Sequence, residues 1–245
     1  IQGWANTEKI IRDCQQSDRR DVTMIALDTE KKMKPALVYQ PIDLDFHVYL
    51  VSNRKVHPGV SLLDATLLAL KGGVRSIQLR EKDLKTRELL RIAYEIRALT
   101  LKFDARLFIN DRVDIAIAIE ADGVQLGQKS IPPYAVRRIA SRLIIGVSTH
   151  SMEEALKAQG QGADFVTLGP IHSTKSKPGM KSLGVENLEL VSKKLSIPVF
   201  GIGGITHENI KEIVERGAFG GAMISGIYGA KDIKQAALKT LKVLK

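Results

Sequence analysis

Three polar residues, Gln78, Arg80 and Lys82, occupy alternate positions of one short segment. Side chains of a β-strand point alternately to its two faces, so these three would share one face of a strand. Burying an unpaired ammonium or guanidinium group is strongly unfavourable, so such a face does not suit an ordinary apolar core. The segment is therefore either an exposed strand with basic side chains in water or one wall of a pocket that holds an anion.

A carboxylate ends another apolar segment, at Asn110-Asp111. Magnesium ions in proteins commonly take one or two carboxylates together with phosphate oxygens of a substrate. Asp111 is therefore a candidate Mg²⁺ ligand. The alternative is an ion pair between Asp111 and Arg80 or Arg112.

Two glycine-containing turns, 201–204 and 225–226, follow the last two apolar segments of the chain. Small residues let backbone N–H groups approach an anion closely, so these turns are candidates for a phosphate site. The stretch 174–179 adds hydroxyl groups and cations, including Thr174, Ser176 and Lys177. It is suited to closing over a phosphorylated substrate, and the alternative is an ordinary solvated loop.

All of these residues stand at the ends of short apolar segments that alternate with helix-like segments. We expect strands at 47–52, 76–82, 106–111, 123–127, 143–148, 165–170, 197–203 and 222–227. Eight consecutive strand–helix units predict an α/β protein with a (β/α)8 (TIM) barrel, in which chemistry gathers at the carboxyl ends of the strands. Residues 46–245 are predicted to form this barrel, and residues 1–45 an N-terminal extension of unassigned role.

The composition narrows the classes of partner. The net charge of +10 suits a polyanion, but only 5% of the residues are aromatic, which leaves few stacking platforms for nucleic acid. No apolar run reaches the roughly 18 residues of a membrane span, and the single cysteine, Cys14, excludes an internal disulfide. We expect a cytoplasmic protein that binds small phosphorylated molecules, not nucleic acid or membrane, and the sequence leaves a homo-oligomer open.

Taken in order, the motifs resemble the superfamily of thiamine phosphate synthases and thiazole tautomerases, and the synthases most closely. The resemblance covers residues 47–243 and rests on Gln78-x-Arg80-x-Lys82, Asn110-Asp111, and the segments 121–128, 146–150, 162–170, 201–205 and 225–227. It implies a transferase that joins 4-amino-2-methyl-5-pyrimidinylmethyl diphosphate to 4-methyl-5-(2-phosphoethyl)thiazole and releases pyrophosphate, with Mg²⁺ as cofactor.

The resemblance also implies a role for each matching residue. It places the diphosphate on Arg80, Lys82, Ser148 and Lys177, the pyrimidine end on Gln78 and Asn110, Mg²⁺ on Asp111, and the thiazole phosphate on Thr174, Ser176, Gly204 and Ser225. Such chemistry needs cations and a metal around the departing charge and little covalent help from the protein.

Two positions depart from the synthase pattern. Ser130 stands where synthases have an aspartate as a second metal ligand, and Gln125 stands where they usually have histidine. Lys82 and Asp111, which tautomerases tend to lose, are both present. The sequence therefore favours a synthase over two alternatives: a thiazole tautomerase with His150 as acid and base, and a non-catalytic barrel that binds a thiamine precursor and regulates through partners.

Overall fold

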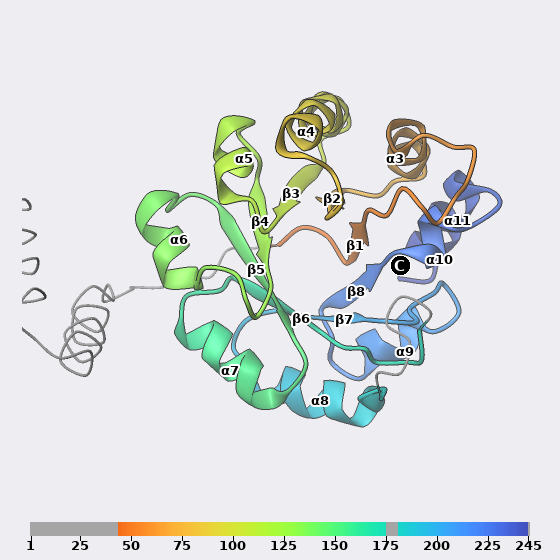
Figure 1. Ribbon diagram of the computed structural model, residues 1–245. Helices are drawn as coiled ribbons and strands as arrows, with labels where there is room; N and C mark the ends of the chain where they lie inside the picture. Colours follow the sequence, from red (N-terminus) through yellow and green to blue (C-terminus); the bar gives the residue numbers. More distant parts are fainter. Residues whose placement is uncertain (1–43, 175–180, 245) are drawn as a thin grey trace, which may run out of the picture. The chain divides into compact units, whose positions relative to one another are not determined.

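The structure is a computed structural model that describes residues 44–174 and 181–244 (Figure 1). These residues lie within one compact unit, 39–245. The expected extension, but for its last two residues, and the expected site residues Ser176 and Lys177 lie outside the described part. None of the described helices is long and apolar enough to cross a membrane.

The described residues form a closed barrel of eight parallel strands in chain order, which confirms the predicted fold. Strand β1 pairs with β2 on one side and with β8 on the other, and this second pairing closes the barrel. The strands are β1 (Val48–Val51), β2 (Ser76–Leu79), β3 (Arg106–Asn110), β4 (Gly123–Leu126), β5 (Ile144–Thr149), β6 (Phe165–Leu168), β7 (Val199–Ile202) and β8 (Gly220–Met223).

Helices surround the barrel in the same order (Figure 1). Ser61 and Ser151 begin two of them, and each side chain accepts a hydrogen bond from a backbone N–H of the first turn. The helices are α3 (Leu62–Lys71), α4 (Thr86–Lys102), α5 (Val113–Ala118), α6 (Pro133–Ile139), α7 (Met152–Gly160), α8 (Gly184–Lys194), α9 (Ile210–Glu215), α10 (Ser225–Tyr228) and α11 (Ile233–Lys242).

Most expected strands are shorter than the sequence pattern indicates, and two of them end three or more residues early. Strand β2 ends at Leu79, because the Arg80 N–H donates to the Ser52 hydroxyl (2.8 Å) instead of continuing the backbone ladder. Strand β8 ends at Met223, and the chain turns at once into the short helix α10. Arg80, Lys82 and Ser225 therefore lie just beyond strand ends and not within strands.

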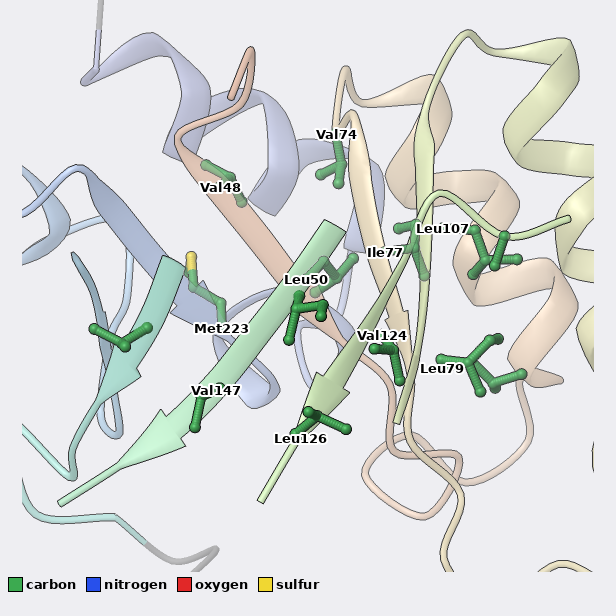
Figure 2. Packing of buried hydrophobic residues seen from close by; sticks show 14 of the residues in the cluster. Val48, Leu50, Val74, Ile77, Leu79, Leu107, Val124, Leu126, Val147 and Met223 are labelled. Atoms are coloured by element: carbon green, nitrogen blue, oxygen red, sulfur yellow. The ribbon is translucent and has the colours of Figure 1, made fainter. Parts of the chain in front are cut away.

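Side chains that point outward from the strands pack against the helices and form the larger core. Figure 2 shows this packing for Val74, which precedes β2, and for the strand residues Val48, Leu50, Ile77, Leu79, Leu107, Val124, Leu126, Val147 and Met223. All of these side chains are buried. The outer layer therefore holds each strand in place from the helix side and leaves the inward positions for a separate set of residues.

The inward side chains divide the barrel interior into two zones. Tyr49, Phe108, Phe165 and Phe200 form an aromatic cluster with Phe46, which precedes β1. Two residues further along β3 and β6, the inward positions hold polar side chains, Asn110 and Thr167. The aromatic cluster therefore fills the amino end of the barrel, and the carboxyl end is left for polar groups.

Candidate active site

A cavity of about 390 Å³ opens at the carboxyl ends of the strands. Six of the eight strands, β1 to β6, or the loops that follow them contribute polar or glycine residues to its lining. These residues are Asn53, Gln78, Arg80, Lys82, Asn110, Asp111, Gly127, Gln128, Lys129, Ser130, Ser148, Thr149, His150, Thr167 and Gly169, with Val51, Ile202 and Ile224 as apolar members. β7 and β8 contribute only apolar residues, Ile202 at the end of β7 and Ile224 just after β8.

Arg80 and Lys82 form a basic wall of this large cavity. The residue between them, Glu81, is buried, and its carboxylate accepts hydrogen bonds from the Ser52 hydroxyl (2.7 Å) and from the backbone and side chain of Arg54 (3.1 and 3.0 Å). The Ser52 oxygen in turn accepts from the Arg80 N–H. Within the described residues neither Arg80 nor Lys82 has an acidic side-chain partner, so both cations are available to an anion.

Asp111 brings a carboxylate to the same cavity from the end of β3. Its backbone is left-handed (φ 68°), a conformation that aspartate tolerates better than most residues, and its N–H donates to the Gln125 carbonyl (2.9 Å). Arg112 instead pairs with Asp114 (Nε–Oδ1 2.8 Å). The alternative ion pairs of Asp111 with Arg80 or Arg112 are therefore not formed, and its carboxylate faces the cavity without a partner in the described chain.

The turn after β4 closes a further side of the cavity. The Ser130 hydroxyl accepts from the Gly127 N–H (2.7 Å), and the Gln128 side-chain amide donates to the Ser148 carbonyl (2.7 Å). Ser130 is thus engaged in holding its own turn. Within the described residues no group of three or more His, Cys, Asp or Glu side chains is placed to hold a metal ion.

Beneath the cavity lies a buried set of hydrogen-bonded side chains. The Tyr49 hydroxyl donates to Gln125 Oε1 (3.2 Å), and Gln125 Nε2 donates to the hydroxyls of Ser148 (3.1 Å) and Thr167 (3.4 Å). Burial raises the pKa of Tyr49 well above its usual range, and a hydrogen bond with Gln78 partly opposes this shift. Tyr49 therefore stays a neutral phenol that keeps its proton.

A second, smaller cavity of about 70 Å³ adjoins the first, and Gly169, Ile202 and Ile224 line both. Gly203 and Gly204 are left-handed (φ 98° and 67°), and a Cβ on Gly204 would lie 2.7 Å from the Cβ of His172. Glycine is thus required where the backbone passes closely over this small cavity. Its lining also includes Thr174 and Ser225.

The structure brings together most of the residues expected from the sequence. Gln78, Arg80, Lys82, Asn110, Asp111 and Ser148 line the large cavity, and Thr174, Gly204 and Ser225 line the small one. Ser176 and Lys177 lie outside the described residues. His150 also lines the large cavity, and its backbone N–H and Nδ1 both contact a Glu154 oxygen (2.7 and 3.1 Å). The functional role of each residue remains a prediction.

Three residues that shape the site were not singled out from the sequence: Tyr49, Thr167 and Ser52. A signal for the first two was present, because strict alternation along β1 and β6 places Tyr49 and Thr167 on the inward face. Nothing local pointed to Ser52, because its partners Arg80 and Glu81 are 28 and 29 residues away in the chain.

Comparison with known proteins gives a consistent result. A family model described as "Thiamine monophosphate synthase" matches residues 48–227. A thiamine-phosphate synthase of Pyrococcus abyssi is 42% identical over 197 residues, covering 80% of this chain and 94% of that protein. A thiamine-phosphate synthase of Alkaliphilus oremlandii is 42% identical over 195 residues, covering 79% and 93%.

A solved structure agrees with these sequence matches. The thiamine phosphate pyrophosphorylase from Pyrococcus furiosus superposes with a TM-score of 0.75 at 38% identity, covering 81% of this chain and 95% of that chain. The family match spans all eight strands of the barrel and the loops that line both cavities. The chain therefore belongs to the thiamine monophosphate synthase family.

Proposed function

We propose that this chain is a thiamine-phosphate synthase that joins the pyrimidine diphosphate to the thiazole phosphate and releases pyrophosphate. One observation carries the proposal: Arg80 and Lys82, two cations without an acidic partner among the described residues, share a cavity with the Asp111 carboxylate, which has no partner there either. A glycine-lined small cavity adjoins it. This arrangement provides one place for a diphosphate and another for a phosphate, as the two substrates require.

The reaction breaks the bond between the pyrimidine methylene carbon and the diphosphate oxygen, and the bonding electrons leave with pyrophosphate. The thiazole nitrogen then supplies the electron pair for the new carbon–nitrogen bond. Arg80 and Lys82 are placed to stabilise the charge that develops on the leaving group. Gln78 and Asn110, on neighbouring strands, are placed to orient the pyrimidine beside them.

The donors of the large cavity fit a hard divalent cation. Asp111 presents a carboxylate that no described residue pairs with, and Mg²⁺ commonly binds through one or two carboxylates, water and substrate phosphates. Asp111 and the diphosphate oxygens would hold the ion, which when bound supplies positive charge to the leaving group. Arg80 and Lys82 share that task with their fixed charges.

The backbone of the small cavity is suited to the phosphate of the thiazole. Gly203 and Gly204 carry no side chain that would keep an anion from the main chain, and Thr174 and Ser225 add polar groups to the lining. Because the two cavities adjoin at Gly169, the thiazole ring would lie between its own phosphate and the pyrimidine methylene.

The direct test is pyrophosphate release by the purified full chain, with both substrates or either one alone, in Mg²⁺ and in EDTA. We expect release that needs both substrates and Mg²⁺. Pyrophosphate release that needs neither the second substrate nor Mg²⁺ would contradict the proposal. Folded protein that binds the thiazole phosphate but releases no pyrophosphate would point to a tautomerase or a regulator, which a His150→Asn variant would then separate.

A further inference from the structure

In the buried hydrogen bonds beneath the large cavity, each group has a fixed role as donor or acceptor. Tyr49, Gln125 and Thr167 are at most 2% exposed, so water does not compete for their polar atoms. The neutral Tyr49 hydroxyl donates to Gln125 Oε1, which leaves the Nε2 end of the amide toward Ser148. An amide nitrogen donates and does not accept. Gln125 therefore meets Ser148 as a donor.

The direction at Gln125 decides what the Ser148 hydroxyl can do. Its oxygen accepts from Gln125 Nε2 (3.1 Å) and, at longer range, from the Thr167 hydroxyl (3.4 Å). Because the Ser148 oxygen accepts these two hydrogen bonds, the hydroxyl is left to donate its own proton. Ser148 also lines the large cavity, so that proton is available to whatever occupies it.

We propose that Gln125 is a positioning residue that fixes Ser148 as a hydrogen-bond donor toward an anion in the large cavity. The identity of that anion, the diphosphate group, rests on the proposed function, whereas the direction of the hydrogen bonds does not. A free serine hydroxyl can rotate between donor and acceptor roles. A hydroxyl already held as a donor loses no orientational freedom when the anion binds.

These hydrogen bonds form a series, here called the relay, that begins at Tyr49 and ends at Ser148. Tyr49, Gln125 and Ser148 carry it across the barrel from β1 through β4 to β5. It reaches a residue expected at the diphosphate through neutral groups alone.

The first experiment measures calorimetric binding of inorganic pyrophosphate, with Mg²⁺, to the full chain and to Gln125→Met. Methionine is similar in size to glutamine but offers no amide donor. We expect the dissociation constant to rise about tenfold or more, as for loss of one hydrogen bond to a charged group. An unchanged dissociation constant in folded Gln125→Met protein would overturn the proposal.

The same substitution in a Ser148→Ala background separates positioning from general support of the fold. If Gln125 acts through Ser148, adding Gln125→Met to Ser148→Ala should weaken pyrophosphate binding no further. A merely structural role would lower the melting temperature and weaken binding by the same factor in both backgrounds. Additive effects would therefore contradict the proposal.

Two tyrosine variants keep the test informative if Gln125→Met fails to fold. Tyr49→Phe removes the donor that orients Gln125, and we expect weaker pyrophosphate binding. Tyr228→Phe is its matched control, because Tyr228 is equally buried and its hydroxyl pairs with Thr66 (2.9 Å) away from both cavities. Equal effects of the two variants would count against the relay.

These experiments distinguish a failure of the positioning role from a failure of the proposed function. If wild-type protein binds pyrophosphate through the relay but releases none from the two substrates, the proposed function is wrong and the positioning role stands. If wild-type protein turns over and the Gln125 and Tyr49 variants bind pyrophosphate like wild type, the proposed function stands and the positioning role is wrong.

Discussion

Asp111 is the one carboxylate among the described residues that line the large cavity, and Arg80, Lys82 and Lys129 are its cationic neighbours in that lining. Its left-handed backbone restricts the choice of residue, because aspartate and asparagine adopt this conformation more readily than other side chains. The position therefore combines a chemical requirement for charge with a backbone requirement that asparagine also meets.

Asp111→Asn should thus remove the charge and leave the turn intact. In Mg²⁺ we expect pyrophosphate to bind about tenfold or more weakly, because the metal loses its protein carboxylate. In EDTA we expect tighter binding, because one repulsive negative charge is gone. Calorimetry in Mg²⁺ and in EDTA measures these two opposite changes in the dissociation constant. The control is Asp114→Asn, whose carboxylate pairs with Arg112 instead. Pyrophosphate binding that weakens equally in Mg²⁺ and in EDTA would exclude a metal role for Asp111.

For individual residues, the sequence was informative about residue types and less informative about their contacts. The alternation of Gln78, Arg80 and Lys82 left two readings open, an exposed strand or one wall of an anion pocket, and all three residues line the large cavity. The expected alternative partners of Asp111 were wrong, because Arg112 lies closer to Asp114 in the turn that begins α5. Which of two nearby carboxylates an arginine meets depends on backbone geometry that residue types alone do not reveal.

Strands β1 and β2 are joined by a serine hydroxyl at each end. At the carboxyl end Ser52 links the Arg80 N–H to the buried Glu81 carboxylate, and at the amino end the Ser76 hydroxyl donates to the Val48 carbonyl (2.8 Å). Both serines are fully buried. The two positions are therefore matched in burial and differ in their distance from the basic wall.

Ser52→Ala should change both stability and binding, and Ser76→Ala should change stability alone. Each loses a buried hydrogen bond, so we expect each to lower the free energy of unfolding by about 1–3 kcal/mol. Only Ser52→Ala also frees the backbone that carries Arg80 and Lys82, so only it should weaken pyrophosphate binding. Denaturant unfolding and calorimetry measure the two effects. Equal binding losses in both variants would show that Ser52 does not position the basic wall.

Element ends were the least predictable part of the fold. The apolar run 222–227 was expected to continue as a strand, but the chain enters α10 at Ser225. The strand at 76–82 was expected to reach Lys82, but it stops where Ser52, 28 residues earlier in sequence, takes the Arg80 N–H. Both ends are set by contacts with other elements, which a local pattern does not contain.

The barrel as a whole was predictable because the sequence pattern of a strand followed by a helix repeats along the chain. Each strand–helix unit is a local pattern, and eight of them in succession leave few arrangements other than a closed barrel. Closure itself, the pairing of β1 with β8, then follows from the number and order of the strands. The hydrogen bonds from Tyr49 to Gln125, 76 residues apart, have no such repetition and could not be foreseen.

Shortened chains test the predicted separation of an N-terminal extension from the barrel. Leu44 and Phe46 precede β1, are 4% exposed and pack in the inner aromatic cluster. A chain that begins at Leu44 should therefore fold and release pyrophosphate like the full chain. One that begins at Val48 lacks Phe46 and should be about 3–5 kcal/mol less stable in denaturant unfolding. Loss of folding in the longer of the two would show that the barrel needs residues 1–43.

Closure of the barrel also bears on how the molecule meets other copies of itself. Every strand of the described barrel has a hydrogen-bonded neighbour on both sides, so no row of free N–H and C=O groups is exposed. Such a row is the usual template on which sheets extend from one molecule to the next and aggregate. Sheet-type aggregation of the barrel should therefore require it to open first, and the temperature at which light scattering rises should follow, not precede, loss of the native fold.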